Sequence, residues 1–273
     1  MSTPTPDMRL AFSTLGCPGL AIADVADVAA RHGFSGVELR AAPGEPVHLG
    51  LEPAGRRDVV TALQARHVDV LALASYVRVA DPAADDDAVV ADGLAHGWLA
   101  ADLGASYLRV FPGGRTGTDA AQDLSDAAAV RRLLRLRDGL AGYGVAVALE
   151  THDSHPAGTD VARILDQCPG VLAIWDALHP WRAGEAPADT ARSLSGRLAY
   201  AQVKDVASAD DLAPLPPGTG ALPLAAMADA LRSNGYRGAV SWEYERAWFP
   251  DATALPDLAG DVAEWMRARF RPG

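Results

Sequence analysis

The chain has 273 residues, of which 49% are hydrophobic, and its formal net charge is −11 at pH 7. A chain of this length and composition can bury a large core, either as one barrel or as two ordinary domains. The acidic excess would repel a phosphate backbone, and the basic stretch from Arg131 to Arg137 has the spacing of an exposed helix face. We therefore expect no nucleic-acid binding.

Two further features bear on where the chain works. The opening segment MSTPTPD lacks the basic and apolar regions of a secretory signal, and no run of about 18 apolar residues occurs, so we expect no membrane partner. Cys17 and Cys168 stand in no metal-binding or redox spacing, which suits two unpaired thiols in a reducing compartment. We predict a cytoplasmic protein with a disordered tail at residues 1–7 and one domain at residues 8–273.

Short apolar runs alternate along the chain with longer Ala- and Leu-rich segments of helical periodicity. The runs predict strands at residues 8–14, 36–40, 68–75, 106–111, 145–150, 171–176, 198–205 and 239–245. The periodic segments predict helices near residues 21–32, 52–66, 86–103, 123–142, 158–167, 188–195, 222–234 and 257–269. Eight consecutive βα units without a long linker favour an α/β fold of one closed (β/α)8 TIM barrel over an open doubly wound sheet.

Glycines support these boundaries. Several predicted helices end at a glycine just before the next strand, as left-handed helix ends require, namely at Gly33, Gly104, Gly144 and Gly235. No GxGxxG motif follows the first strand, where a dinucleotide-binding fold would carry it. The pair Gly113-Gly114 and the PPGTG stretch at 216–220 are interpreted as loop glycines, and a phosphate cradle there is the less favoured alternative.

Polar side chains occupy strand positions that an ordinary strand would fill with apolar residues. Alternate side chains of a barrel strand face the interior, and active-site groups come from the C-terminal strand ends. This alternation directs inward Glu38, Arg40, Arg109, Glu150, Asp176, Gln202, Lys204, Glu243 and Glu245. It directs toward the helical layer Leu149, Trp175, Val203, Trp242 and Tyr244.

Four of the inward residues stand at the ends of four successive strands, Glu150, Asp176, Gln202 and Glu243. A single acidic residue at a strand end is more often a helix cap or an ion-pair partner. Three buried carboxylates close together, however, would cost several kcal/mol in repulsion and desolvation unless a cation neutralised them. The pattern therefore predicts one divalent metal ion held by these four residues.

An ordered series of motifs also resembles a known family. The motifs are GFSGVELR at 33–40, LRVFPGG at 108–114, ALETHD at 148–153, WDALHP at 175–180, QVKD at 202–205 and SWEYE at 241–245. Together they look like the sugar phosphate isomerase/epimerase family, the xylose isomerase-like TIM barrels. Each motif is weak alone, but their order and spacing span most of the chain.

The resemblance implies a single Mn²⁺, Mg²⁺ or similar ion, held by Glu150, Asp176, the residue at position 202 and Glu243. This chain has Gln202 where the family more commonly has histidine. An amide oxygen in place of an imidazole nitrogen makes the protein ligands all oxygen, which favours Mn²⁺ or Mg²⁺ over Zn²⁺ or Co²⁺. The related trinuclear zinc endonucleases need more histidine and acidic ligands than this sequence supplies at suitable positions.

The reaction implied by the resemblance is isomerisation or epimerisation of a sugar or related polyhydroxy carbonyl compound. A metal that binds the carbonyl and a neighbouring hydroxyl stabilises the enediolate formed when the α-proton leaves. In the related ketose epimerases two metal-bound glutamates take and return that proton, which assigns these roles to Glu150 and Glu243. A metal-dependent lyase or dehydratase resembling the inosose dehydratases, a hydrolase, and a non-catalytic ligand-binding barrel remain alternatives.

Further residues could contact a small sugar-like substrate. The resemblance places the histidine of the DxxH motif, His179, near the substrate, and His152 follows Glu150 by two positions. The remaining candidates are Lys204, Arg109 and Glu38, for each of which a buried ion pair is the alternative. An aromatic rim could be formed by Trp181, Trp248 and Phe249. For the assembly we expect a homodimer or homotetramer.

Overall fold

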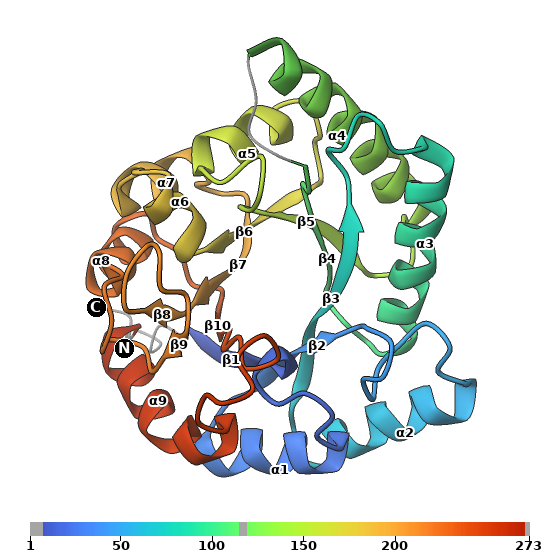
Figure 1. Cartoon of the computed structure of the whole chain (residues 1–273). Coiled ribbons are helices and arrows are strands. Elements are labelled where there is room, and N and C mark those ends of the chain that lie inside the picture. The colour runs from blue at the N-terminus through green and yellow to red at the C-terminus, as the bar shows by residue number, and fades with distance from the viewer. Residues whose placement is uncertain (1–7, 115–118, 271–273) are drawn as a thin grey trace, which may run out of the picture.

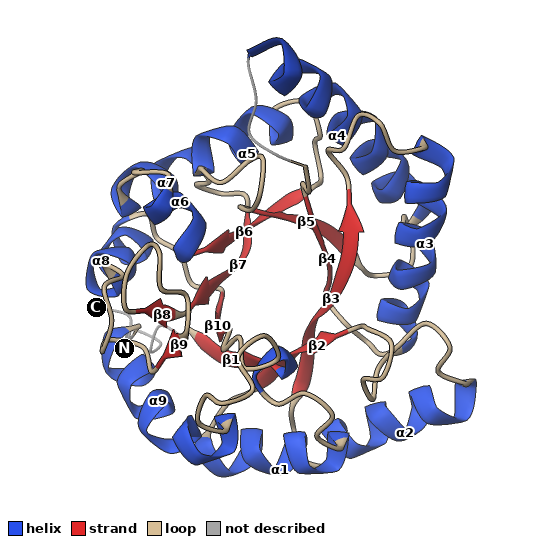
Figure 2. Cartoon of the chain, in the orientation of Figure 1, coloured by secondary structure: helices blue, strands red, loops and turns tan. Residues whose placement is uncertain are grey.

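A closed barrel of parallel strands forms the centre of the fold, and helices surround it (Figures 1 and 2). The computed structural model describes residues 8–114 and 119–270, so the tail expected at residues 1–7 lies outside the described residues. The barrel strands are β1 (Arg9–Ser13), β2 (Gly36–Arg40), β3 (Asp69–Arg78), β4 (Tyr107–Phe111), β5 (Ala146–Glu150), β6 (Leu172–Asp176), β7 (Leu198–Val203) and β10 (Ala239–Trp242). The barrel closes between β1 and β10, which pair in parallel.

The helices lie outside the barrel and follow the strands in chain order (Figure 1). They are the 3-10 helix η1 (Thr14–Gly16) and the α-helices α1 (Ile22–His32), α2 (Pro53–Gln64), α3 (Asp86–Asp102), α4 (Asp119–Gly139), α5 (Gly158–Leu165), α6 (Leu178–Arg182), α7 (Pro187–Ser193), α8 (Leu224–Ser233) and α9 (Leu255–Arg269). Two short strands, β8 (Asp205–Val206) and β9 (Pro214–Leu215), form a separate antiparallel hairpin. The predicted TIM barrel is thus confirmed.

The predicted elements differ from the observed ones mainly at their ends. β3 continues to Arg78, α4 begins at Asp119, and β10 ends at Trp242, so that Glu243 and Glu245 follow the strand rather than belong to it. Helix α6 and the β8–β9 hairpin were not predicted. Both are too short to show a period in the sequence, and α6 begins directly after β6, where Asp176 Oδ1 accepts a hydrogen bond from Leu178 N at 2.7 Å.

Two apolar layers hold the barrel and its helices together. The larger core joins the outer strand faces to the helices and contains all five residues predicted to face the helical layer, Leu149, Trp175, Val203, Trp242 and Tyr244. A smaller cluster contains mainly small side chains, together with Ile174, Leu71 and the ring of Tyr200. Because the larger core contains the outward residues, the predicted alternation along the strands is correct there.

The predicted helix-end glycines have the expected conformation. Gly33, Gly104, Gly144 and Gly235 all have φ between 70° and 77°. The two cysteines are buried and unpaired, as expected. Burial raises the pKa of the Cys17 thiol to about 12, so it stays protonated and unreactive at neutral pH. Within the described residues, no helix combines the length and apolar character needed to cross a membrane.

The buried carboxylate of Asp205 organises the loop that follows β7. Asp205 is 1% exposed and accepts hydrogen bonds from four backbone amides, those of Val206, Gly218, Gly220 and Leu222, at 2.8–3.1 Å. A Cβ atom at Gly220 would lie 2.4 Å from Asp205 Oδ1, so a side chain would not fit there. The amides of the PPGTG stretch therefore bind the protein's own carboxylate, which corrects the alternative of a phosphate cradle at 216–220.

Candidate metal centre and active site

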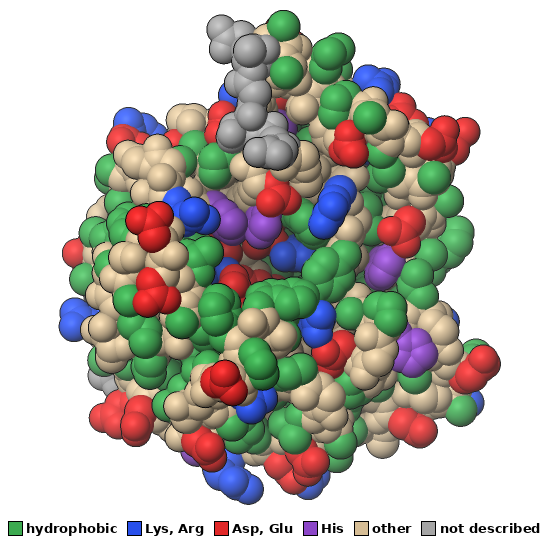
Figure 3. Space-filling view, in the orientation of Figure 1, with side chains coloured by type: hydrophobic (Ala, Val, Ile, Leu, Met, Phe, Trp, Pro, Cys, Tyr) green, Lys and Arg blue, Asp and Glu red, His purple; other side chains and the backbone are tan. Residues whose placement is uncertain are grey.

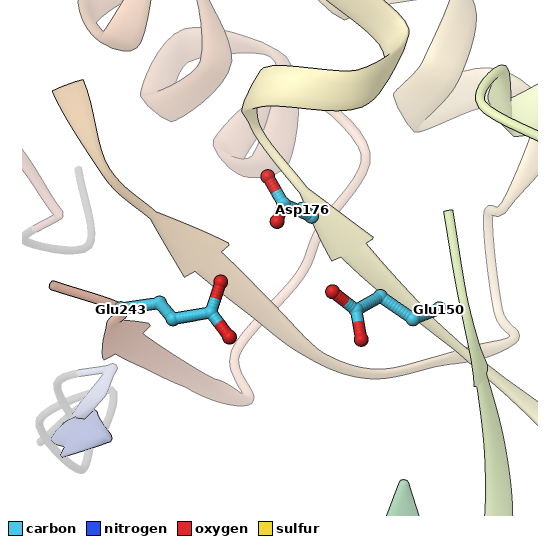
Figure 4. Close-up of side chains that lie close together, drawn as sticks. All are labelled: Glu150, Asp176 and Glu243. Atoms are coloured by element: carbon cyan, nitrogen blue, oxygen red, sulfur yellow. The ribbon is translucent and has the colours of Figure 1, made fainter. Parts of the chain in front are cut away.

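Three carboxylates converge at the C-terminal ends of the barrel strands (Figure 4). Glu150 ends β5, Asp176 ends β6, and Glu243 follows β10. All three are buried, and each offers an oxygen within 4.8 Å of the others. In Figure 3 acidic, basic and histidine side chains gather around a hollow at the centre of this face. The barrel thus brings together the three acidic residues that the sequence singled out.

The spacing and the hydrogen bonding of this cluster suit a divalent cation. Two oxygens on opposite sides of an Mg²⁺ ion, each at about 2.1 Å from it, are about 4.2 Å apart. The three carboxylate oxygens of the cluster, which lie within 4.8 Å of one another, are thus close enough to share one ion. Glu150 Oε1 and Gln202 Oε1 are buried without a hydrogen-bond partner among the described residues. A buried acceptor without a partner costs about 1–3 kcal/mol, and a cation would remove that cost.

Lys204 lies within the acidic cluster, one residue beyond the end of β7. Its ammonium group forms ion pairs with Asp176, Glu243 and Glu245. The contact between Lys204 Nζ and Asp176 Oδ2 is 2.8 Å long. Three carboxylates outweigh the effect of burial and hold the pKa of Lys204 well above its usual value, so the side chain is a permanent cation.

Arg109 is the second cation of the site and comes from β4. The guanidinium contacts Glu150 Oε2 through Nε and donates to the backbone oxygen of Ser75 at 2.6 Å. It also lies 4.7 Å from the centre of the Phe111 ring. Arg109 is only 8% exposed, so its contacts fix the orientation of the Glu150 carboxylate.

When its carboxylates are ionised, the site carries excess negative charge, which a further cation or bound protons would balance. When ionised, the four carboxylates of Glu150, Asp176, Glu243 and Glu245 exceed the two cations, Lys204 and Arg109, by two negative charges. Burial raises the pKa of Asp176 and of Glu243, and Lys204 opposes this effect. A divalent ion supplies the two missing positive charges, so the residues present fit such an ion.

The two predicted histidines lie side by side at the mouth of the barrel. The rings of His152 and His179 are 4.0 Å apart between centres, and His179 Nε2 is 3.8 Å from Asp176 Oδ2. His179 lies on α6. Burial and the neighbouring positive charges hold the pKa of His179 well below its usual value, so the ring is neutral at neutral pH.

A pocket of about 280 Å³ opens beside His179. Its other lining residues are Asp153, Pro156, Arg182 and Ala183. Arg182 is exposed and forms no ion pair within the part of the chain that the structure describes. The pocket is thus lined mainly by polar and charged side chains.

Glu38, one of the residues expected to contact a substrate, lies in a buried hydrogen-bond network. Its side chain is fully buried, and both oxygens accept hydrogen bonds from Tyr200, Gln202 and Ser241. Burial and the nearby Glu243 raise the pKa of Glu38 to about 7. Tyr200 and Ser241 were missed in the sequence, although each precedes a predicted ligand, Gln202 or Glu243, by two positions and so shares its inward side.

The predicted aromatic rim is present only in part. Trp248 is 52% exposed, packs edge-on against Tyr76 and lies over the guanidinium of Arg40 at 4.9 Å. Trp181 instead packs against the core of the helical layer, so its expected position at the rim is wrong. Phe249 and Trp248 together line a pocket of about 590 Å³ beside the β8–β9 hairpin.

A second polar cluster supports the loop after β5. His155 Nε2 lies 2.8 Å from Asp126 Oδ1, and Nδ1 lies 2.9 Å from Ser154 Oγ. Ser154 Oγ also donates to the backbone oxygen of Gly113 at 2.6 Å. His155 and Ser154 are 0% and 2% exposed, and the contacts of this cluster tie two loops together.

The buried His155 ring gives a prediction for the pH dependence of stability. Burial lowers the pKa of His155 below 6.5 despite the opposing effect of Asp126. Below pH 6.5 the histidine is therefore protonated in the unfolded chain but stays neutral in the native one. The contribution of His155 is therefore full above pH 6.5 and decreases below it, by at most about 1.4 kcal/mol per pH unit. In urea titrations between pH 7.5 and 5.5, His155→Gln should show a shallower decrease than the wild type. Equal slopes for His155→Gln and the wild type would contradict the assignment.

The fold and the site together define a TIM barrel with an acidic cluster at the C-terminal ends of its strands. The family model of the xylose isomerase-like TIM barrel matches residues 26–269. The chain belongs to this family. A search of curated proteins gave no match.

Solved structures share the fold at low sequence identity. The crystal structure of the IolI protein with a bound zinc atom is 20% identical, with a TM-score of 0.81 over 96% of this chain and 99% of that one. A probable 3-DHS dehydratase, AsbF, from Bacillus anthracis is 18% identical, with a TM-score of 0.77 over 94% of this chain and 98% of that one. D-allulose 3-epimerase from Methylomonas sp. is 20% identical, with a TM-score of 0.74 over 98% of this chain and 100% of that one.

Proposed function

We propose that the chain is a divalent-metal-dependent isomerase or epimerase that acts on a sugar or a related polyhydroxy carbonyl compound. One observation carries the proposal. Glu150 and Glu243 come from strands on either side of β6 and β7, and Figure 4 shows their carboxylates pointing toward each other past Asp176. Two carboxylates that face one position from two sides can remove a proton from one face of a carbon and return it to the other.

Glu150, Asp176, Gln202 and Glu243 are the residues proposed to hold the ion. Because all four offer oxygen, Mn²⁺ or Mg²⁺ is the preferred ion, with Co²⁺ or Zn²⁺ as alternatives. The bound zinc atom of the IolI protein, whose fold this chain shares, supports a metal in this chain. When bound, the ion would polarise the substrate's carbonyl group and stabilise the negative charge that develops on its oxygen.

The remaining residues of the site are proposed to bind and orient the substrate. Lys204 and Arg109 are fixed cations that can donate to hydroxyl or carbonyl oxygens and that keep Glu243 and Glu150 in position. The neutral ring of His179 and the adjacent His152 can donate to further hydroxyl groups. The D-allulose complex of the related epimerase supports a sugar-like ligand. We further propose a cytoplasmic location and a homodimer or homotetramer.

Dehydration is the second candidate because the two sides of the site are unlike. Glu150 is held by Arg109 and has His152 two residues away, whereas Glu243 contacts Lys204 and Gln202. If only one carboxylate reaches the α-carbon, proton removal leads to loss of a β-hydroxyl group rather than to inversion. The similarity to a probable 3-DHS dehydratase supports keeping this candidate.

Solvent exchange tests the proposal directly. The Mn²⁺-loaded protein is incubated in D₂O with ketohexoses and with cyclic polyhydroxy ketones, and deuterium at the α-carbon is measured by NMR. We expect incorporation into at least one compound, with formation of its epimer or isomer, because both reactions remove the α-proton. Exchange accompanied by an unsaturated product would favour dehydration.

Two variants serve as controls for the exchange experiment. Glu243→Gln should reduce exchange by at least about 100-fold, since it removes a proposed base. Glu264→Gln, an exposed change on α9, should leave exchange at the wild-type rate. Tight metal and sugar binding without exchange into any compound would contradict the proposed isomerase and favour a ligand-binding barrel.

A further inference from the structure

Glu38 has a hydrogen-bond arrangement that a residue buried only for packing would not need. Tyr200 OH donates to Glu38 Oε2 and Ser241 Oγ donates to Oε1, both at 2.6 Å. Gln202 Nε2 donates to Oε2 at 3.1 Å. The donors come from β7 and β10, on strands other than β2, which carries Glu38. Three donors thus fix one carboxylate within the barrel.

The amide of Gln202 is held on its nitrogen side by two carboxylates. Besides Glu38, Glu243 Oε1 accepts from Gln202 Nε2 at 3.1 Å. The two hydrogens of the amide nitrogen are therefore used, whereas Gln202 Oε1 is buried without a partner among the described residues. Rotating the amide by 180° would place its oxygen against two carboxylates and lose these hydrogen bonds, so only one orientation is stable.

We propose that Glu38 is a positioning residue that orients the Gln202 amide so that its oxygen, not its nitrogen, serves as the fourth metal ligand. An amide bound through oxygen completes an all-oxygen set with Glu150, Asp176 and Glu243. This inference rests on the metal site of the proposed function. It assigns to Glu38 a task different from the substrate contact expected from the sequence.

The alternative is that Glu38 acts only through its negative charge. A carboxylate attracts a nearby cation whatever residue stands at position 202, whereas an orienting contact matters only while position 202 carries an amide. The two possibilities therefore differ in whether the effects of replacing Glu38 and Gln202 depend on each other. A double-mutant cycle measures that dependence.

The experiment measures the Mn²⁺ dissociation constant by calorimetry for the wild type, Glu38→Met, Gln202→Met and the double variant. Methionine at position 38 removes the acceptor of the Gln202 amide as well as the charge. Loss of an outer-shell partner weakens metal binding by about 10- to 100-fold, and we expect this for Glu38→Met when Gln202 is present. In the Gln202→Met background, Glu38→Met should change the dissociation constant by less than about twofold, since no amide remains to be oriented.

Ser241→Ala provides a second variant should Glu38→Met fail to fold, because it removes one donor to Glu38 without altering Gln202. It should weaken Mn²⁺ binding several-fold in the wild-type background and not in the Gln202→Met background. An equal loss in both backgrounds, or no loss when Gln202 is present, would overturn the positioning role. A wild-type protein that binds no Mn²⁺ would instead overturn the metal site itself.

Discussion

Replacing Glu150 or Glu243 by glutamine is expected to weaken Mn²⁺ binding by more than about 100-fold, because loss of an outer-shell contact alone costs about 10- to 100-fold. Each change removes one of the two uncompensated negative charges and one of the three clustered carboxylates. Glu150→Gln also leaves the buried guanidinium of Arg109 without its charged partner. Calorimetry and elemental analysis of the purified variants measure the loss.

Thermal unfolding gives a second readout of the same prediction. Binding to the native state alone adds about 2.7 kcal/mol of stability when free Mn²⁺ is 100 times the dissociation constant. The wild type and the surface variant Glu264→Gln should therefore unfold at a higher temperature with Mn²⁺ than with EDTA. Glu150→Gln and Glu243→Gln should unfold at the same temperature in both. Unchanged metal content in both variants would exclude the assigned ligands.

Asp205→Ala is expected to lower the free energy of unfolding by about 3–5 kcal/mol, because each buried amide left without an acceptor costs about 1–3 kcal/mol. Removing the carboxylate leaves the amides of Val206, Gly218, Gly220 and Leu222 without their acceptor. Hydrogen bonds to a charged group contribute about 1.5–3 kcal/mol each, and water entering the site would offset part of the loss. Chemical denaturation monitored by circular dichroism measures the change.

The neighbouring Asp210 provides a matched control for Asp205. It is exposed in the same loop, so Asp210→Ala should change stability by less than about 0.5 kcal/mol. The stability of Asp205→Asn should lie between those of Asp205→Ala and Asp210→Ala. The amide oxygen of asparagine can still accept hydrogen bonds, whereas its nitrogen would face the backbone amide donors. If Asp205→Ala were as stable as Asp210→Ala, the carboxylate would not be what holds the loop.

The barrel and its acidic cluster could be predicted because both follow from periodicity. The alternation of apolar runs with helical segments identified the strands, and the two-residue alternation brought Glu150, Asp176 and Glu243 to one mouth. Trp175 and Trp242 on the opposite strand faces supported the same assignment. These patterns depend on backbone geometry alone, and the closed barrel needs little else.

The role of Glu38 could not be predicted in the same way. Alternation tells whether a side chain points inward, but it does not give its height along the barrel axis, which depends on strand tilt and stagger. Glu38 pairs with Ser13 and Ala72 and lies within hydrogen-bond reach of Tyr200, below Gln202 on β7. The packing of Trp181 could not be predicted either, because the five-residue helix α6, which turns it toward the helical layer, is too short to be recognised in the sequence.

Because Asp205 anchors both ends of the loop after β7, the exposed segment between them can be exchanged without loss of those contacts. The four amide contacts lie at the base of the loop, at residues 206 and 218–222, whereas residues 207–211 between them are exposed. In a barrel of this kind, loops at the C-terminal strand ends surround the substrate. Segments of different length and chemistry could therefore be grafted between Val206 and Pro214 to alter which molecules enter the site, while Lys204 and the carboxylates stay in place.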